Sequence, residues 1–201
     1  MMQEDIESTS ELKVLETKTN QMLDNGKAYY RNALERNSIS DLHHSLLYIK
    51  ASCSDLIKYG FQNVSAAYWC SLVYSRMAMD YYTRCNFVRC STHAENGLHL
   101  LEKMDFSKVE ASDIHQDDTP DNLRIRLYFA LGASCIKLKD FERAEEYLRK
   151  GLELSPHHAE LTSAFHEAQA ELDRFQRKRS LGRNDRNDDD LKRKTPGQNI
   201  E

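Results

Sequence analysis

The chain has 201 residues, a length that suits one domain or one domain with a tail. It contains only seven glycines and three prolines, and this scarcity argues against a β-sandwich or barrel, because those folds need frequent turns. The formal net charge of −4 and an isoelectric point near 6.1 leave no basic excess of the kind that nucleic-acid binding requires. We therefore expect an all-α fold of long helices joined by short links.

The N-terminal residues 1–5 are mostly polar and acidic, and no apolar region follows them, so we expect no secretory signal peptide. The longest apolar stretch, residues 65–74, is too short to span a bilayer. The five cysteines are odd in number and include no CxxC pair, which predicts reduced thiols. We expect a protein of the cytoplasm, with the nucleus as the alternative, and no contact with a membrane.

The first two helices are expected between a polar N-terminus and a glycine. Residues 1–10 are acidic and polar, and we expect them to be disordered. A helical spacing of apolar residues begins near Glu11. Residues 37–41 interrupt it, and Ser40 is the expected N-cap of the second helix. This helix is expected to stop at Gly60.

Two more helices are expected in the middle of the chain. Asn63 or Ser65 can cap the third, whose apolar residues run towards Val88. Ser91 or Thr92 is the expected start of the fourth. At the start of each helix, the side chain of such a capping residue would accept from a backbone amide that the helix itself leaves unpaired.

The second half of the chain begins with an acidic segment. Residues 105–122 carry many acidic side chains and few large apolar ones, and we expect an exposed acidic loop there. Residues 179–201 have almost no apolar side chain and cannot bury enough surface to offset the entropy cost of ordering, so we expect a disordered charged tail. The folded helical domain is therefore expected over residues 11–178. Its last three helices are expected over 123–138, 140–154 and 159–177.

Residues 125–158 carry small, aromatic and helix-ending residues at a fixed spacing. Tyr128 is followed by a Leu-Gly pair that ends at Gly132, a small residue stands at Ala144, and Pro156 cannot continue a helix. Because Gly132 and Ala144 are small, two helix backbones can approach closely at these positions. The pattern resembles the tetratricopeptide repeat, a helix–turn–helix unit of 34 residues.

Three residues of this segment depart from the family pattern. Cys135 stands where Tyr is usual, Leu148 where an aromatic residue is usual, and Gly151 where Ala is usual. Asp140 is the expected N-cap of the second helix of the unit. The resemblance over this one repeat is strong despite the departures.

Two earlier segments resemble the repeat more loosely. In residues 76–104, Tyr81 and Tyr82 stand near the Leu-Gly site and Ala94 at the small site, while Gly26 is the small residue of a first repeat. One hairpin cannot bury its apolar face alone, so neighbours are required. The resemblance implies about three repeats, stacked as antiparallel hairpins in a short superhelix with the last helix as its cap. An unrelated helical bundle with one accidental repeat is the alternative.

In this family the first helix of each hairpin lines a concave groove that binds an extended peptide or a partner helix. The lining positions, carried over to this chain, imply a groove in which basic residues outnumber acidic ones, with apolar pockets between them. Such a surface suits an acidic segment with one or two hydrophobic anchors. For each position alone, a solvated charge or a core residue is the alternative. The implied lining residues are Leu23, Lys27, Tyr30, Arg31, Arg76, Met79, Thr83, Asn86, Arg126, Phe129, Ala133 and Lys137.

Some members of the family clamp the C-terminal carboxylate of a heat-shock chaperone with specific Lys, Asn and Arg residues. Here Leu23, Lys27, Asp80 and Ala130 stand at clamp positions that need other residues, and only Arg126 is compatible. The carboxylate of Asp80 would repel a bound carboxylate. We therefore expect this chaperone interaction to be absent or much weakened.

The sequence contains no GxSxG, Walker A, GxGxxG or HExxH motif. Cys85, Cys90 and His93 do not have a zinc-site spacing and lack a fourth ligand. We expect no enzyme activity, no catalytic residues, no metal, no cofactor and no small-molecule substrate.

The resemblance implies a protein-interaction module such as an adaptor, co-chaperone or assembly factor. It would hold a protein or peptide partner, as a monomer or within a hetero-complex. The alternative is a structural subunit of a larger complex whose helical surface is permanently buried. Basic clusters at residues 177–179 and 192–194 resemble a bipartite nuclear import signal. Nucleic acid is not expected as a partner, because the tail has little net positive charge.

Overall fold

A computed structural model describes residues 2–58, 64–103, 105 and 117–193, and side chains within 13–52, 64–103, 105 and 117–178. This part of the chain is helical and holds no strand, which confirms the expected all-α fold. Its helices are α1 (Met2–Arg36), α2 (Ile39–Lys58), α3 (Val64–Thr83), α4 (Phe87–Lys103), α5 (Pro120–Leu138), α6 (Phe141–Leu154) and α7 (Ala159–Arg193).

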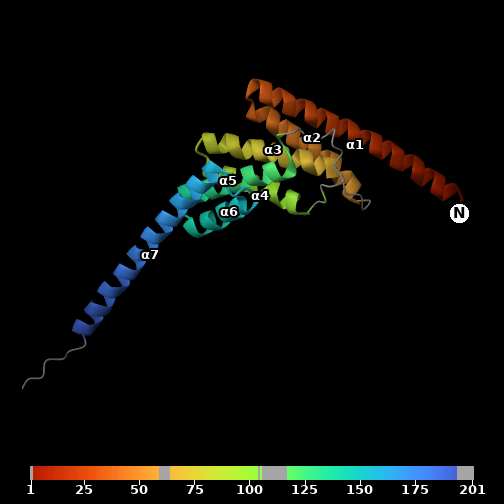
Figure 1. The fold of residues 1–201 in the computed structure, drawn as a ribbon. Helices are drawn as coiled ribbons and strands as arrows, with labels where there is room; N and C mark the ends of the chain where they lie inside the picture. Colours follow the sequence, from red (N-terminus) through yellow and green to blue (C-terminus); the bar gives the residue numbers. More distant parts are fainter. Residues whose placement is uncertain (1, 59–63, 104, 106–116, 194–201) are drawn as a thin grey trace, which may run out of the picture.

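Six of these helices form three hairpins, and the seventh packs on the last hairpin. The pairs are α1 with α2, α3 with α4, and α5 with α6, while α7 contacts α6 and α5. Figure 1 shows the hairpins stacked side by side, with the N-terminal part of α1 and the C-terminal part of α7 projecting from the body in different directions. Buried apolar side chains run from α1 through α5, and a second buried cluster joins α5, α6 and α7. The expected stack of helix hairpins is therefore confirmed.

The three hairpins share one turn geometry. In each, the first helix is followed by one residue with positive φ, and the next residue caps the second helix. The amide of this capping residue donates to the carbonyl five residues earlier, and its side chain accepts from the amide three residues later. The positive-φ residues are Asn37, Cys85 and Lys139, at 49°, 58° and 64°, and the caps are Ser38, Asn86 and Asp140.

These caps confirm one expected position and correct two. Asp140 accepts from the Arg143 amide at 3.4 Å, as expected. The second helix is capped by Ser38 rather than Ser40, because the Ser38 hydroxyl accepts from the Asp41 amide at 3.2 Å. The fourth helix begins at Phe87 rather than at Ser91 or Thr92, since the left-handed backbone at Cys85 ends α3 early and Asn86 caps α4. The expected helix stop at Gly60 and the cap Asn63 lie outside the described residues.

The shared turn fixes how the second hairpin aligns with the third. Asn86 then corresponds to Asp140, so Ala78 and Cys90 take the places of Gly132 and Ala144, and Ala94 takes that of Leu148. The expected alignment, with Tyr82 at the glycine site and Ala94 at the small site, is therefore wrong by four residues. Its physical cause is the connection before α5, which spans Lys103 to Pro120 and breaks the fixed 34-residue period.

A second contact supports this alignment. Gly97 and Gly151 occupy equivalent positions, and a leucine side chain of the following helix packs against each of them. A Cβ built on Gly97 would lie 3.0 Å from a methyl carbon of Leu127, and one built on Gly151 would lie 2.9 Å from a methyl carbon of Leu161. The two hairpins therefore hold their next neighbour in the same way.

The small residues act as the sequence predicts. A Cβ on Gly132 would clash with Leu148, and one on Gly26 would clash with Ile49. In both hairpins the missing side chain lets the second helix pack directly on the first. Both glycines are close-contact positions between the two helices of their hairpins. The shared turn, however, puts Tyr30 and not Gly26 in the place of Gly132, so the expected register of the first repeat is also wrong by four residues.

The two ends of the chain differ from the expectation. Residues 2–10 belong to α1, and α7 continues to Arg193, where disorder was expected from composition. A helix satisfies its own backbone hydrogen bonds without burial, and between Ala159 and Arg193 the sequence has no proline and one glycine, Gly182. Most of the acidic segment 105–122 lies outside the described residues, so the domain boundaries remain a prediction. Among the described helices, none is long and apolar enough to cross a membrane.

Candidate partner-binding groove

The groove residues expected on α1 divide into core and surface. Leu23 and Tyr30 are each only 6% exposed, so they belong to the core and do not line an open groove. Both belong to the core that α1 forms, mainly with α2, and on the α3 side the rings of Tyr30 and Trp69 meet edge to face at 5.8 Å. The Lys27 ammonium lies 5.3 Å from the centre of the Trp69 ring. Arg31 is exposed on the same helix.

The residues expected on α3 and its turn have mixed environments. Met79 is half-buried and packs against the core, while Arg76 is exposed. The Asn86 side chain caps α4, and the Thr83 hydroxyl donates to the Asp80 carbonyl at 2.8 Å. The alignment of the turns gives Met79 and Thr83 the places of Ala133 and Lys137 in the third hairpin. Asn86 is thus a structural cap as well as an expected contact.

A pocket of about 420 Å³ opens between α3, α5 and α7. Three of the expected groove residues, Phe129, Ala133 and Lys137, line it. The Phe129 ring meets the Tyr82 ring edge to face at 6.1 Å, and Lys137 Nζ lies 3.4 Å from Glu167 Oε1 at the rim. The lining residues are Tyr82, Phe129, Ala133, Ile136, Lys137, Ala159, Glu160, Ser163, Ala164 and Glu167.

The α7 side of this pocket was not predicted, because the last helix was expected only as the cap of the stack. The signal was a run of small residues on one side of that helix: Ala159, Ser163 and Ala164 leave room for a ligand beside α5. Glu167, also on α7, pairs its carboxylate with Lys137 at the rim. The rim therefore carries one basic side chain against two acidic ones, and the pocket itself is not basic.

The basic part of the groove lies closer to the start of α5. Arg126 Nη2 donates to the Asp117 carbonyl at 2.6 Å and to the carboxylate of Asp118. The Tyr68 hydroxyl donates to the Asp118 carbonyl at 3.0 Å. We call these four residues the Asp118 latch: Arg126 and Tyr68 donate hydrogen bonds, and Asp117 and Asp118 accept them. Arg126 is therefore already paired with an acidic side chain of its own chain.

The latch also affects Tyr30. Burial raises the pKa of the Tyr30 hydroxyl, and the nearby Asp118 carboxylate raises it further, while Arg76 and Arg126 oppose both. Arg76, Arg126 and Asp118 therefore all act electrostatically on one phenol. The expected cations Arg76 and Arg126 thus share one neighbourhood, which adjoins the pocket because Arg126 precedes Phe129 by one helical turn on α5.

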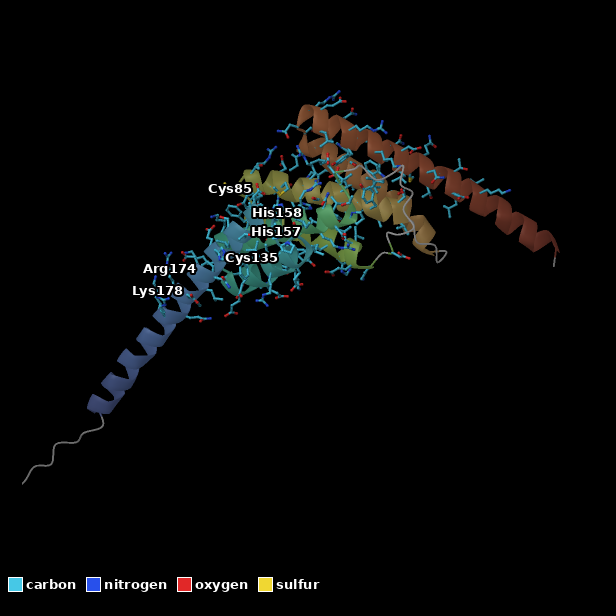
Figure 2. All side chains as sticks on the ribbon, viewed as in Figure 1. Cys85, Cys135, His157, His158, Arg174 and Lys178 are labelled. Carbon is cyan, nitrogen blue, oxygen red and sulfur yellow. The ribbon has the colours of Figure 1, made fainter. Side chains whose placement is uncertain are left out.

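The cysteine and histidine residues that could suggest a metal site point to different neighbours. Cys90 Sγ lies 3.7 Å from the Ala130 carbonyl, and the His93 ring stacks on Tyr81. Figure 2 shows Cys85 at the turn end of α3. Within the described residues, no three His, Cys, Asp or Glu side chains are grouped to hold a metal ion.

Comparison with known proteins gives one family match. The family model described as Tetratricopeptide repeat matches residues 125–158. A search of curated proteins finds no match for the chain. Tetratricopeptide repeats are non-enzymatic units that mediate protein–protein interaction. The matched residues form α5, α6 and the turn between them, so the family model matches the same segment in which the sequence resembles this repeat most strongly, within a stack of helix hairpins.

Proposed function

We propose that this chain is an adaptor or assembly factor that binds an acidic segment of a protein partner and takes one hydrophobic side chain of that segment into the pocket. The pocket carries the proposal, because it lies at lining positions of the matched repeat, Phe129, Ala133 and Lys137. Its volume of about 420 Å³ is close to the lower end of small-ligand sites and accommodates a large apolar side chain.

The Asp118 latch supports the acidic character of the partner. An arginine fork is suited to a carboxylate, and Arg126 holds one in the folded chain. A partner carboxylate beside Arg76 and Arg126 would lie about one helical turn from the pocket. An acidic residue next to a large apolar one would then reach both places. The partner would have to displace Asp118 from Arg126.

A bulky residue at the rim tests the proposal. Ser163 is exposed and lines the pocket, so Ser163→Trp should fill it without disturbing the core. Ala170 is exposed on α7 two turns further on and does not line the pocket, so Ala170→Trp is the matched control. We expect partners recovered with the wild type and the control to be lost with Ser163→Trp. Equal recovery with all three proteins would remove the pocket from the interaction.

A photo-crosslinking amino acid at position 163 makes the same test direct. The crosslink should join the partner at or next to a large apolar residue that has acidic neighbours. Mass spectrometry of the crosslinked peptide reads out both features. A crosslinked segment that is basic would contradict the acidic part of the proposal and leave the pocket in place.

The structural-subunit alternative is favoured by a different observation. Three exposed apolar side chains lie on separate helices outside the pocket: Val14 at 67%, Leu47 at 66% and Val88 at 64% exposed. A permanent neighbour could cover them. Sedimentation of the purified chain separates the two functions, because an adaptor should remain a monomer at micromolar concentration, whereas an isolated subunit should self-associate.

The location is a separate proposal. Arg174 and Lys178 lie on the part of α7 that projects from the body (Figure 2), where an import receptor could reach the basic residues. We propose import into the nucleus through the basic clusters at 177–179 and 192–194. A reporter fused to residues 175–201 should accumulate in the nucleus. A reporter that stays in the cytoplasm would leave the cytoplasm as the location.

A further inference from the structure

Helices α2, α3 and α4 meet in a cluster of aromatic and cationic side chains that shares no residue with the pocket. The His93 ring lies flat against the Tyr81 ring, with 5.2 Å between centres and 3° between planes, and 5.9 Å from the Tyr74 ring. Three cationic or titratable side chains, His43, Lys50 and Arg89, lie near this stack. We call the set the His93 cluster: His43 and Lys50 from α2, Tyr74 and Tyr81 from α3, and Arg89 and His93 from α4.

Two nitrogen atoms of the cluster converge on one oxygen. Arg89 Nη1 donates to the Tyr81 hydroxyl oxygen at 3.4 Å, and His43 Nε2 lies 3.2 Å from the same oxygen. The guanidinium also lies 5.5 Å from the centre of the Tyr81 ring. Lys50 Nζ lies 5.1 Å from the Tyr74 ring centre. Because His43, Lys50 and Arg89 are exposed, their remaining N–H groups can reach a ligand.

The cluster has positive charge without an acidic partner. In the described part of the chain, His43, Lys50 and Arg89 form no ion pair with a carboxylate. Burial lowers the pKa of His93 to about 4, and the three groups lower it in the same direction. The buried Nδ1 of His93 also has no hydrogen-bond partner in the structure.

The third hairpin shows what is missing here. Arg143 corresponds to Arg89, and its Nη2 donates to Glu95 Oε1 of the preceding hairpin at 2.8 Å. In the turn alignment, Leu47 of the first hairpin corresponds to Glu95 of the second. Leu47 is 66% exposed and cannot accept a hydrogen bond. The same arginine position is therefore neutralised in the third hairpin and left without a carboxylate in the second.

We propose that the His93 cluster is a binding site for a phosphate group, held by Arg89, His43 and the Tyr81 hydroxyl, with Lys50 attracting its second charge. A phosphate monoester presents three oxygens and almost two negative charges, so it can bond an arginine, an imidazole and a hydroxyl together. A phosphorylated segment of a protein and a small phosphate compound share this chemistry. The proposal does not depend on the pocket, since the two sites have no residue in common.

The full-length chain, labelled for imidazole NMR, tests this site with two probes: a short phosphoserine peptide and inorganic phosphate. We expect saturable shifts of His43 and His93, and a rise in the pKa of His93 as a dianion binds beside it. The unphosphorylated peptide should give no shift, and its glutamate version a weaker one. Tighter binding of the peptide would identify a phosphorylated protein segment as the source, and equal binding a small phosphate compound; either result supports the site.

Matched variants decide whether the arginine holds the ligand. Arg89→Gln should weaken binding about tenfold, the effect of losing a charge-assisted hydrogen bond. Arg84→Gln should change it little, because Arg84 is paired with Asp80 at 2.7 Å. Lys50→Gln, at an exposed position, gives the same test if Arg89→Gln does not fold. Shifts that sodium chloride reproduces at equal ionic strength, or that survive Arg89→Gln and Lys50→Gln, would overturn the proposal.

Discussion

The second and third hairpins have the same backbone design with different side chains. In both hairpins the turn has one residue with left-handed backbone before the capping residue. In both, a glycine of the second helix also packs against a leucine of the helix that follows. Yet Gly132 and Leu148 of the third hairpin correspond to Ala78 and Ala94 of the second. Ala78 and Ala94 are both fully buried. We infer that these two positions hold a matched pair of volumes, a glycine facing a leucine in the third hairpin and two alanines in the second.

The largest expected effect comes from making the third hairpin resemble the second. Leu148 is fully buried against Gly132, so Leu148→Ala should lower the free energy of unfolding by about 2–5 kcal/mol. Adding Gly132→Ala to this variant recreates the alanine pair and should recover part of the loss. Urea unfolding of the single and double variants measures both values.

Gly132→Ala alone is the control for that cycle. Its new methyl group would clash with Leu148, so the single variant should also be less stable than the wild type. A double variant whose loss equals the sum of the two single losses would break the comparison. The paired volumes of the second hairpin would then have no bearing on the third.

The next largest effect is a loss of stability at low pH, which we expect from the second hairpin because it has a histidine where the third has a tyrosine. His93 of the second hairpin corresponds to Tyr147 of the third, and the pKa of His93 is lowered to about 4, mainly by burial. Above pH 6.5 both folded and unfolded chains hold this ring neutral, and the full stability is present. As pH falls from 6.5 to 4 the unfolded chain binds the proton more readily, so stability falls.

We expect this loss to be about 1–2 kcal/mol after allowing for solvent screening of a partly exposed ring. His93→Tyr should remove it, which urea unfolding at several pH values can measure. His166, exposed on α7, is the matched control, and His166→Gln should keep the wild-type pH dependence. An unchanged slope in His93→Tyr would show that other groups cause the loss.

Sequence spacing predicted the third hairpin well, because Gly132, Ala144 and Asp140 each have one local role that the residue type reveals. It misplaced the second hairpin because the long connection before α5 breaks the period, and because Cys85 takes a left-handed backbone that glycine usually signals. Helix endings of this kind depend on the whole turn and not on one residue type.

The candidate site was predicted in part for a similar reason. Position in the repeat found Phe129 and Lys137, which both line the pocket. It also selected Leu23 and Tyr30, which are buried in the core, since burial depends on neighbouring helices that spacing does not describe. The α7 side of the pocket and the Asp118 latch arise from tertiary contacts between distant segments, and no local pattern encodes them.

A smaller effect tests whether the three turns are equivalent. A non-glycine residue in the left-handed region is strained, so Cys85→Gly and Lys139→Gly should each raise the free energy of unfolding by about 0.5–1 kcal/mol. Asn37→Gly should gain less, because asparagine tolerates this conformation. Thermal unfolding of the three variants ranks them. A loss of stability in one variant alone would show that its turn depends on side-chain contacts that the other two lack.

The smallest effect concerns the Asp118 latch, which the second hairpin lacks because buried Leu72 corresponds to Arg126. The paired side chains are 39% and 21% exposed, so Asp118→Asn should cost less than about 1 kcal/mol of stability. The same change should strengthen binding of an acidic partner segment, since Arg126 no longer has to release a carboxylate of its own chain. Asp121→Asn is the control, because that carboxylate pairs with Arg124 instead. Binding that weakens in Asp118→Asn and not in the control would mean that the latch shapes the groove, so that Asp118 supports the partner site and does not compete for it.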